Sequence, residues 1–166
     1  MPVLPVGSTA GQISLADAGK CYLLFTNPLV ASTVGLESSI IVFKNPATSG
    51  KNMHLLDCIF INHTSAAVQV FKFYFNPTIT TPGTAATIQP IIMGGTQPAS
   101  VMTWFISPGV NISANGTAFR SYQTALTPSP ILDVPIIAPG GNMLITVTPL
   151  VTTNQTIDIC FVWAEY

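Results

Sequence analysis

Hydrophobic and polar residues alternate along several short runs of this chain. In the run 68–75, three phenylalanines fall on one face of an extended strand, and Val70, Lys72 and Tyr74 fall on the other. In the run 156–165, large apolar residues again occupy every second position, and the residues between them are only weakly polar. The period of two predicts β-strands, several of which are apolar on both faces.

Turn-forming residues separate these runs along the whole chain. The sequence contains 14 prolines and 12 glycines, and Asn-Pro pairs at 27–28, 45–46 and 76–77 each follow an apolar strand. Short strands divided by such signals are typical of a β-sandwich or barrel. The pattern predicts strands at residues 13–15, 20–26, 39–43, 53–62, 67–75, 84–89, 101–107, 117–122, 131–137, 143–148 and 156–164.

The chain length favours a single domain. At 166 residues, two domains would be cramped, and no linker composition divides the sequence. Residues 1–12 contain two prolines and little periodic pattern, so they are predicted to form an extended N-terminal arm. Residues 13–166 are predicted to form one all-β domain.

Charged residues make up only 7% of the chain, whereas about 25% is usual in soluble proteins. The net charge is −1, and the few lysines and Arg120 are scattered, so no basic cluster is available to bind nucleic acid. A surface this poor in charge is unfavourable for a lone soluble monomer. We therefore expect much of the surface to be covered by other subunits.

A membrane location is not expected either, although hydrophobic residues reach 48%. The apolar runs are as long as strands, far short of the roughly 20 residues that a spanning helix needs. The first residues lack the basic start and continuous apolar core of a signal peptide. The three cysteines, Cys21, Cys58 and Cys160, are odd in number and lie in apolar runs, so no disulfide framework is predicted.

No combination of residues predicts catalysis, a metal site or a cofactor. The loop 44–52 contains Ser-Gly-Lys, but it has Asn45 where a phosphate-binding loop needs glycine, and a strand pattern follows it. His54 and Cys58 are expected on one strand face, with Asp57 and His63 on the other, so the four cannot converge on a metal. We expect no enzyme activity.

Three segments in order carry a resemblance to a known family. Residues 40–62 combine an apolar strand, Asn-Pro, a Ser-Gly-Lys turn and a long strand. Residues 70–91 hold a second Asn-Pro and a strand that starts Gly-Thr-Ala, and residues 135–166 hold a Pro-Gly-Gly turn and a last hairpin ending in Trp-x-Glu. From about Ile40 onward this order resembles jelly-roll virion proteins of tailed bacteriophages, in particular small capsid decoration or cement proteins.

The resemblance implies an antiparallel jelly-roll-like β-sandwich that forms a homotrimer. It implies a structural role on the outer surface of the capsid, where the protein would bind the major capsid protein and stabilise contacts between capsomers. No functional residues transfer from the family, because this role depends on surfaces. By position, the interface is expected to include residues of the arm and of two weakly polar strand faces: Val3, Leu4, Val6, Val70, Tyr74, Val162 and Ala164.

Two other functions fit the same sequence. A receptor-binding or adhesive module, such as a fibre head, would need an exposed groove of aromatic and polar residues. A subunit of an open filament would link to its neighbours through the arm and Cys21. An enzyme is the least favoured class.

Overall fold

The computed structural model describes residues 20–26, 29–31, 33–63, 69–81, 83–90, 98–106, 109–110, 118, 120–124, 129–130, 136–151 and 155–166. Their regular secondary structure consists of strands alone. In chain order these are β1 (Cys21–Phe25), β2 (Leu29–Ala31), β3 (Ser38–Lys44), β4 (Met53–Asn62), β5 (Gln69–Phe75), β6 (Ile79–Thr81), β7 (Thr84–Ala85), β8 (Gln89–Pro90), β9 (Thr103–Ile106), β10 (Gly109–Val110), β11 (Arg120–Thr124), β12 (Ser129–Pro130), β13 (Ile136–Ile137), β14 (Asn142–Pro149) and β15 (Gln155–Glu165).

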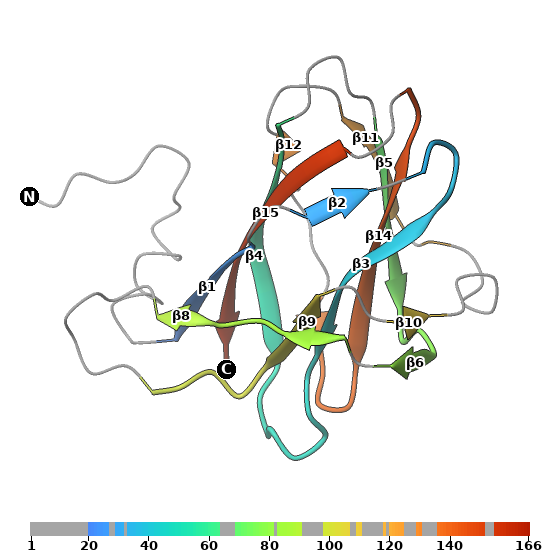
Figure 1. Ribbon diagram of the computed structural model, residues 1–166. Helices are drawn as coiled ribbons and strands as arrows, with labels where there is room; N and C mark the ends of the chain where they lie inside the picture. The colour runs from blue at the N-terminus through green and yellow to red at the C-terminus, as the bar shows by residue number, and fades with distance from the viewer. Residues whose placement is uncertain are drawn as a thin grey trace, which may run out of the picture.

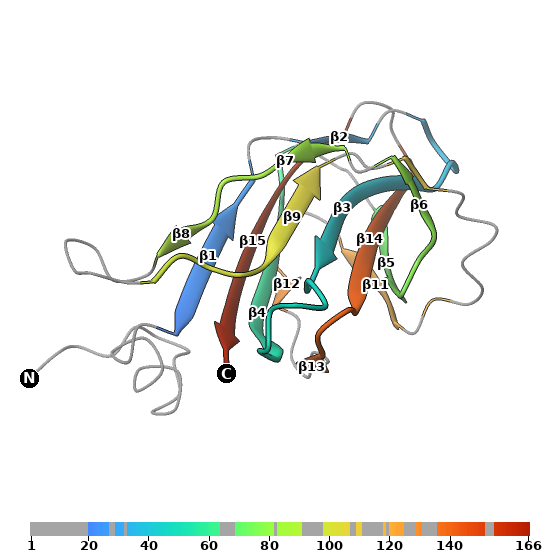
Figure 2. The ribbon, with the colours of Figure 1, turned by 90° about the horizontal axis from the view of Figure 1, so that it is seen from below.

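Two antiparallel sheets form the body of the molecule (Figure 1). Sheet A has the order β12-β4-β15-β1-β8, with β13 also paired to β4 and β2 also paired to β15. Sheet B has the order β11-β5-β14-β3-β9-β7, and β6 and β10 form a separate small ribbon. Figure 2 shows the two sheets as stacked layers. The predicted all-β, antiparallel, sandwich-like fold is therefore confirmed.

The main hydrophobic core lies between the two sheets. Each sheet contributes one face of its central strands, as the alternating sequence pattern predicts. Aromatic rings join the layers: Phe60 of sheet A stacks on Phe71 of sheet B at 3.9 Å, and Phe161 of sheet A lies 4.6 Å from Trp104 of sheet B. Burial of these large side chains is the principal force that holds the layers together.

A bulge interrupts the regular alternation of β4. The register with β15 shifts between Val162 and Trp163, and both Leu55 and Cys58 belong to the core cluster although three positions separate them. His54 is outside that cluster, and its ring contacts Tyr166 at 4.5 Å. The expectation that His54 and Cys58 share a strand face is therefore wrong, because the sequence pattern alone did not reveal the bulge.

One short segment connects the edges of both sheets. Within residues 84–90, β7 pairs with β9 of sheet B and β8 pairs with β1 of sheet A. The predicted single strand at 84–89 is thus two short strands that serve different sheets. Figure 2 shows this segment running along the outside of β9 and β1, so the sandwich is closed along this side.

Candidate interaction surfaces

The loop 44–52 is a connection between the sheets that Asn45 organises. The Asn45 amide nitrogen donates to the carbonyl oxygens of Lys51 and Ile137, both at 2.8 Å, and Ser49 Oγ donates to Asn45 Oδ1 at 2.6 Å. Asn45 is 2% exposed, and the loop returns to the sheet through Gly50, whose φ of 63° favours glycine. The Ser-Gly-Lys sequence therefore lies in a strand-connecting loop, as the sequence indicated.

A buried carboxylate fixes the segment that leads into β9. Glu165, 1% exposed, accepts hydrogen bonds from Trp163 Nε1 at 3.2 Å and from the backbone N–H of Val101 at 3.3 Å. Ser100 Oγ donates to the same carboxylate, and Lys51 Nζ lies 3.4 Å from it. The Trp-x-Glu sequence of the last strand thus supplies both a core ring and the anchor beside it.

A second carboxylate holds the β2–β3 connection against the outer face of sheet B. Glu37 accepts hydrogen bonds from Lys72 Nζ at 2.6 Å, Tyr74 Oη at 2.7 Å and Thr146 Oγ1 at 2.5 Å. Burial on its own raises the pKa of Glu37, but these bonds together outweigh it and lower the pKa below its ordinary value. The charged form of Glu37 therefore stabilises the folded chain.

Replacing Glu37 with glutamine should remove a pH-dependent part of the stability. Because the folded pKa is below the unfolded one, the stabilisation is present above about pH 4.5 and is lost as pH falls through the folded pKa. We expect Glu37→Gln to destabilise by about 1 kcal/mol near neutral pH. The difference from wild type should shrink toward about pH 3, measured by denaturant unfolding at several pH values. A difference that grows on acidification would contradict this assignment.

The outer face of sheet A carries a partly exposed apolar patch, bordered by Asp57, which lies opposite Val162. Leu23 lies opposite Val162, and Phe25 lies opposite Cys160, which in turn lies opposite Ile59 on β4. Facing residues of an antiparallel pair share a side, so these five side chains form continuous rows. Phe25 is 55% exposed, and the other four are partly exposed. This face is therefore suited to contact with an apolar surface of another molecule.

Burial makes the ionisable groups along this face harder to deprotonate. Burial raises the pKa of Asp57, although a hydrogen bond from the Cys58 N–H acts in the opposite direction. Burial likewise raises the pKa of the Cys160 thiol, and it raises the pKa of Cys21 to about 11. The protonated thiols are poor nucleophiles at neutral pH.

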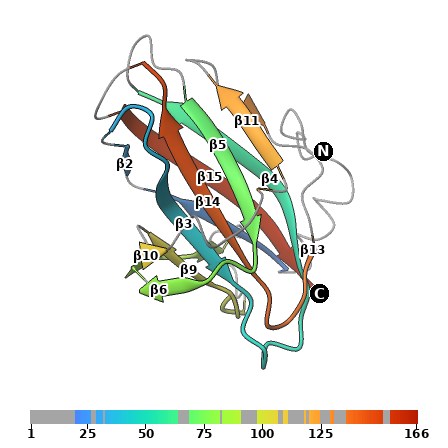
Figure 3. The ribbon, with the colours of Figure 1, turned by 90° about the vertical axis from the view of Figure 1, so that its right-hand side faces the viewer.

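Four exposed aliphatic side chains gather at one end of the sandwich. We call this the apolar tip, formed by Val34, Leu36, Leu150 and Val151, which are 41%, 56%, 40% and 53% exposed. The Gly35 N–H donates to the Pro149 carbonyl at 2.8 Å, so the two turns that carry these residues lie together. Figure 3 shows both turns at the top of the molecule. Turns usually carry polar residues, so an aliphatic cluster here indicates a binding surface.

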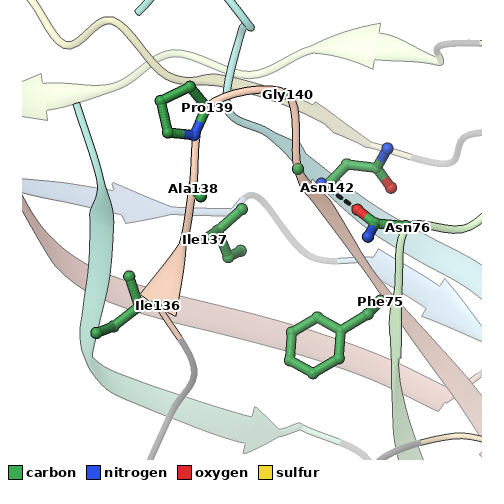
Figure 4. A pocket seen from close by; sticks show the side chains of 9 residues that line it. Phe75, Asn76, Ile136, Ile137, Ala138, Pro139, Gly140 and Asn142 are labelled. Carbon is green, nitrogen blue, oxygen red and sulfur yellow. Dashed lines mark hydrogen bonds between the residues drawn. The ribbon is translucent and has the colours of Figure 1, made fainter. Parts of the chain in front are cut away.

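A cavity of about 520 Å³ opens at the other end. We call it the end cavity; it is lined by Phe75 and Asn76 at the end of β5 and by the β13–β14 segment 136–142. Two of its apolar side chains, Phe75 and Ile136, are 43% and 58% exposed. Figure 4 shows Phe75 on one side and the 136–140 backbone on the other, with the bond from the Asn142 N–H to Asn76 Oδ1.

The residues expected at an interface lie in different environments. Val70 and Val162 are half-buried on strands of sheets B and A, whereas Tyr74 and Ala164 are covered by the chain itself, at 4% and 0% exposed. Tyr74 packs with Val42 and Leu144 in a second apolar cluster. Val3, Leu4 and Val6, with the rest of the predicted arm, lie outside the described residues.

One histidine among the described residues contacts a carboxylate. His63 and Asp158 form one contact, with 2.6 Å between Nε2 and Oδ2, at the end of the β4–β15 pair. No group of three or more potential metal-ligating side chains occurs in the part of the chain that the structure describes. Within the same part, no helix has the length and apolarity to cross a membrane.

No family model, curated protein or solved structure matches this chain.

Proposed function

We propose that this chain is a structural virion protein that binds the outside of a bacteriophage head and stabilises contacts between capsomers. The observation that carries the proposal is the exposed apolar surface: the tip and the outer face of sheet A, in a chain with 7% charged residues. Such a surface fits a permanent protein contact. The buried side chains of Asn45 and Glu165 anchor a loop and the segment that leads into β9, which suits a structural role.

The strand pairing supports a jelly roll as the finer description of the fold. The main strands pair in a nested order, in which early strands pair with late ones and the pairs proceed toward the middle of the sequence. The pairs are β1 with β15, β3 with β14, β4 with β12 and β13, and β5 with β11. This nesting is what a long folded-over hairpin produces when it rolls into two sheets. It also agrees with the family that the sequence resembles.

In the proposed role, binding strengthens the shell by mass action. A protein that contacts two neighbouring capsomers binds the closed shell better than separated capsomers, so it stabilises the closed state. Trimers bring several copies of the binding surface to the shell, so weak single contacts add up to stable attachment. The partners in this proposal are the major capsid protein and further copies of this chain.

The direct test mixes the purified protein with undecorated heads of its parent phage. We expect co-sedimentation that saturates at a fixed copy number, together with a higher temperature of head disruption. Deleting residues 1–12 should weaken attachment while the thermal unfolding of the free protein stays unchanged. Failure of the full chain to co-sediment would overturn the proposal, and binding to host cells or glycans instead would favour a receptor-binding module.

A further inference from the structure

One side-chain carboxylate in the described part of the chain differs from the others in its partners. The other three each contact a basic side chain of the same chain. These ion pairs are Lys72–Glu37 at 2.6 Å, Lys51–Glu165 at 3.4 Å and His63–Asp158 at 2.6 Å. Asp57 takes part in no ion pair among the described residues. Its charge is therefore left for a group outside this part of the chain.

The hydrogen bonding of Asp57 is also incomplete. The Cys58 N–H bonds to the carboxylate, but Asp57 Oδ1 is buried and has no hydrogen-bond partner among the described residues. A buried oxygen without a donor costs free energy, and more so when it carries charge. A donor from another molecule would therefore be stabilised at this oxygen.

The strand register places Asp57 at the border of an apolar surface. We call this surface the sheet A patch; it consists of the five apolar residues of two neighbouring cross-strand rows. One row is Leu23, Val162 and then Asp57, and the next is Phe25, Cys160 and Ile59. Figure 2 shows the three strands β1, β15 and β4 side by side. Facing side chains in such a row are about 5 Å apart, so a group that bonds to Asp57 also contacts the patch.

The bulge in β4 is what brings Asp57 to this face. Val162 lies opposite Asp57 and Trp163 lies opposite Leu55, so β4 has one extra residue between the two pairs. Leu55 belongs to the core, and in an unbroken strand Asp57 would share its face. The extra residue reverses the alternation and directs the carboxylate outward, as bulges at binding sites do.

The chain itself is a poor source of a cation for Asp57. The sequence has five Lys and Arg residues in total. Lys51 and Lys72 are held in the ion pairs above, and the Nζ atoms of Lys20 and Lys44 lie 5.8 and 5.4 Å from the centroids of aromatic rings. Four of the five therefore already have a contact, which favours a different molecule as the partner.

We propose that the sheet A patch binds a partner protein through an apolar surface that carries one basic side chain, which pairs with Asp57. The apolar side chains supply most of the buried area, and the ion pair fixes the orientation of the partner. A wholly apolar partner would leave a buried charge unpaired, which is strongly unfavourable. The inference rests on the proposed function for the identity of the partner, the major capsid protein, but the chemistry of the patch can be tested without heads.

The first test uses three small probes with the same alkyl chain. Hexylguanidinium, hexanol and hexanoate are titrated into the protein while the amide chemical shifts of β1, β4 and β15 are followed by NMR. Hexylguanidinium should bind about fivefold more tightly than hexanol, and hexanoate should bind most weakly. Asp57→Asn should remove this preference. Glu37→Gln, which removes a carboxylate from the opposite sheet, is the matched control and should keep it.

The pH dependence gives a second readout on wild type. Because burial raises the pKa of Asp57 above its ordinary value of 3.8, acidification from about pH 7 to about pH 4 should weaken hexylguanidinium binding and not hexanol binding. The nearby thiols of Cys58 and Cys160, and that of Cys21 on β1, have pKa values raised by burial, so they stay neutral in this range. Measuring Asp57→Asn over the same range removes any contribution of His54.

Three results with the probes would overturn the inference: equal affinity for all three, a preference that survives in Asp57→Asn, or hexylguanidinium binding that strengthens toward pH 4. A native mass that falls in Asp57→Asn would also overturn it, because a second copy would then occupy the patch. If circular dichroism shows that Asp57→Asn is unfolded, the pH dependence of wild type decides.

Phage heads separate this inference from the proposed function. Asp57→Asn should attach to undecorated heads about fivefold more weakly than wild type, and Glu37→Gln should attach as wild type does. Equal attachment of wild type and Asp57→Asn would overturn the inference and leave the proposed function standing. A wild type that prefers hexylguanidinium but does not attach to heads would support the chemistry of the patch and overturn the proposed function.

Discussion

Replacing Trp104 with alanine should destabilise the protein by about 3–5 kcal/mol. Trp104 is 1% exposed and contacts Phe43 at 4.6 Å within sheet B, and Phe161 at 4.6 Å and Trp163 at 5.5 Å in sheet A. Its removal leaves a cavity where the two layers meet, and the surrounding rings cannot collapse fully to fill it. At 2–4 °C per kcal/mol, the midpoint of thermal unfolding should fall by about 10 °C.

Trp104→Phe is the matched control for this prediction. The Trp104 Nε1 has no hydrogen-bond partner among the described residues, so the indole N–H is buried at a cost. Phenylalanine keeps most of the ring contacts and removes that N–H, so its stability should lie within about 1 kcal/mol of wild type. Chemical denaturation measures the free energy of unfolding of both variants. An equal loss of stability in the two would show that ring packing does not account for the stability that Trp104 contributes.

Glu165→Ala should cost about 3 kcal/mol, because it leaves several buried donors without an acceptor. The Trp163 indole, the Ser100 hydroxyl and the Val101 N–H all donate to this carboxylate. The ion pair contributes less, since the Lys51 side chain is 36% exposed. Hydrogen exchange should increase most in the segment that enters β9, because its anchor is lost.

Two further variants separate these contributions. Glu165→Gln keeps a carbonyl oxygen that can accept from the indole and the hydroxyl. Its loss of stability should therefore be at most half that of the alanine variant. Lys51→Met removes the cation alone and should change the unfolding free energy by less than about 1 kcal/mol. A larger effect for Lys51→Met than for Glu165→Ala would mean that the ion pair dominates, contrary to the geometry.

The strands with strong alternation were predictable, and the shortest were not. The bounds of β4 match the prediction, and those of β14 and β15 differ by one residue at each end. The pattern missed β2, β6, β10 and β12, which have only two or three residues each. Such strands form because a neighbouring strand or turn offers backbone partners, and the local sequence does not record that.

The apolar surfaces were harder to predict than the fold. The alternation of Tyr74 with core phenylalanines predicts an interface position, whereas in the structure its side chain packs with Val42 and Leu144 of the same sheet. The tip had a signal that strand periodicity does not use: valine and leucine flanking Gly35, and again directly after Pro149. Large aliphatic residues at a turn have no local reason to be there, so they identify a surface where we expect a partner to bind.

The nested pairing has a consequence for how the chain is synthesised. β15 is the central strand of sheet A, and it separates β1 from β4, yet it is the last of these strands to leave the ribosome. Until then β1 and β4 have no common partner, so the nascent chain exposes apolar strand edges that can aggregate. Folding of sheet A must follow the translation of β15, and pairing across such long separations makes it slow.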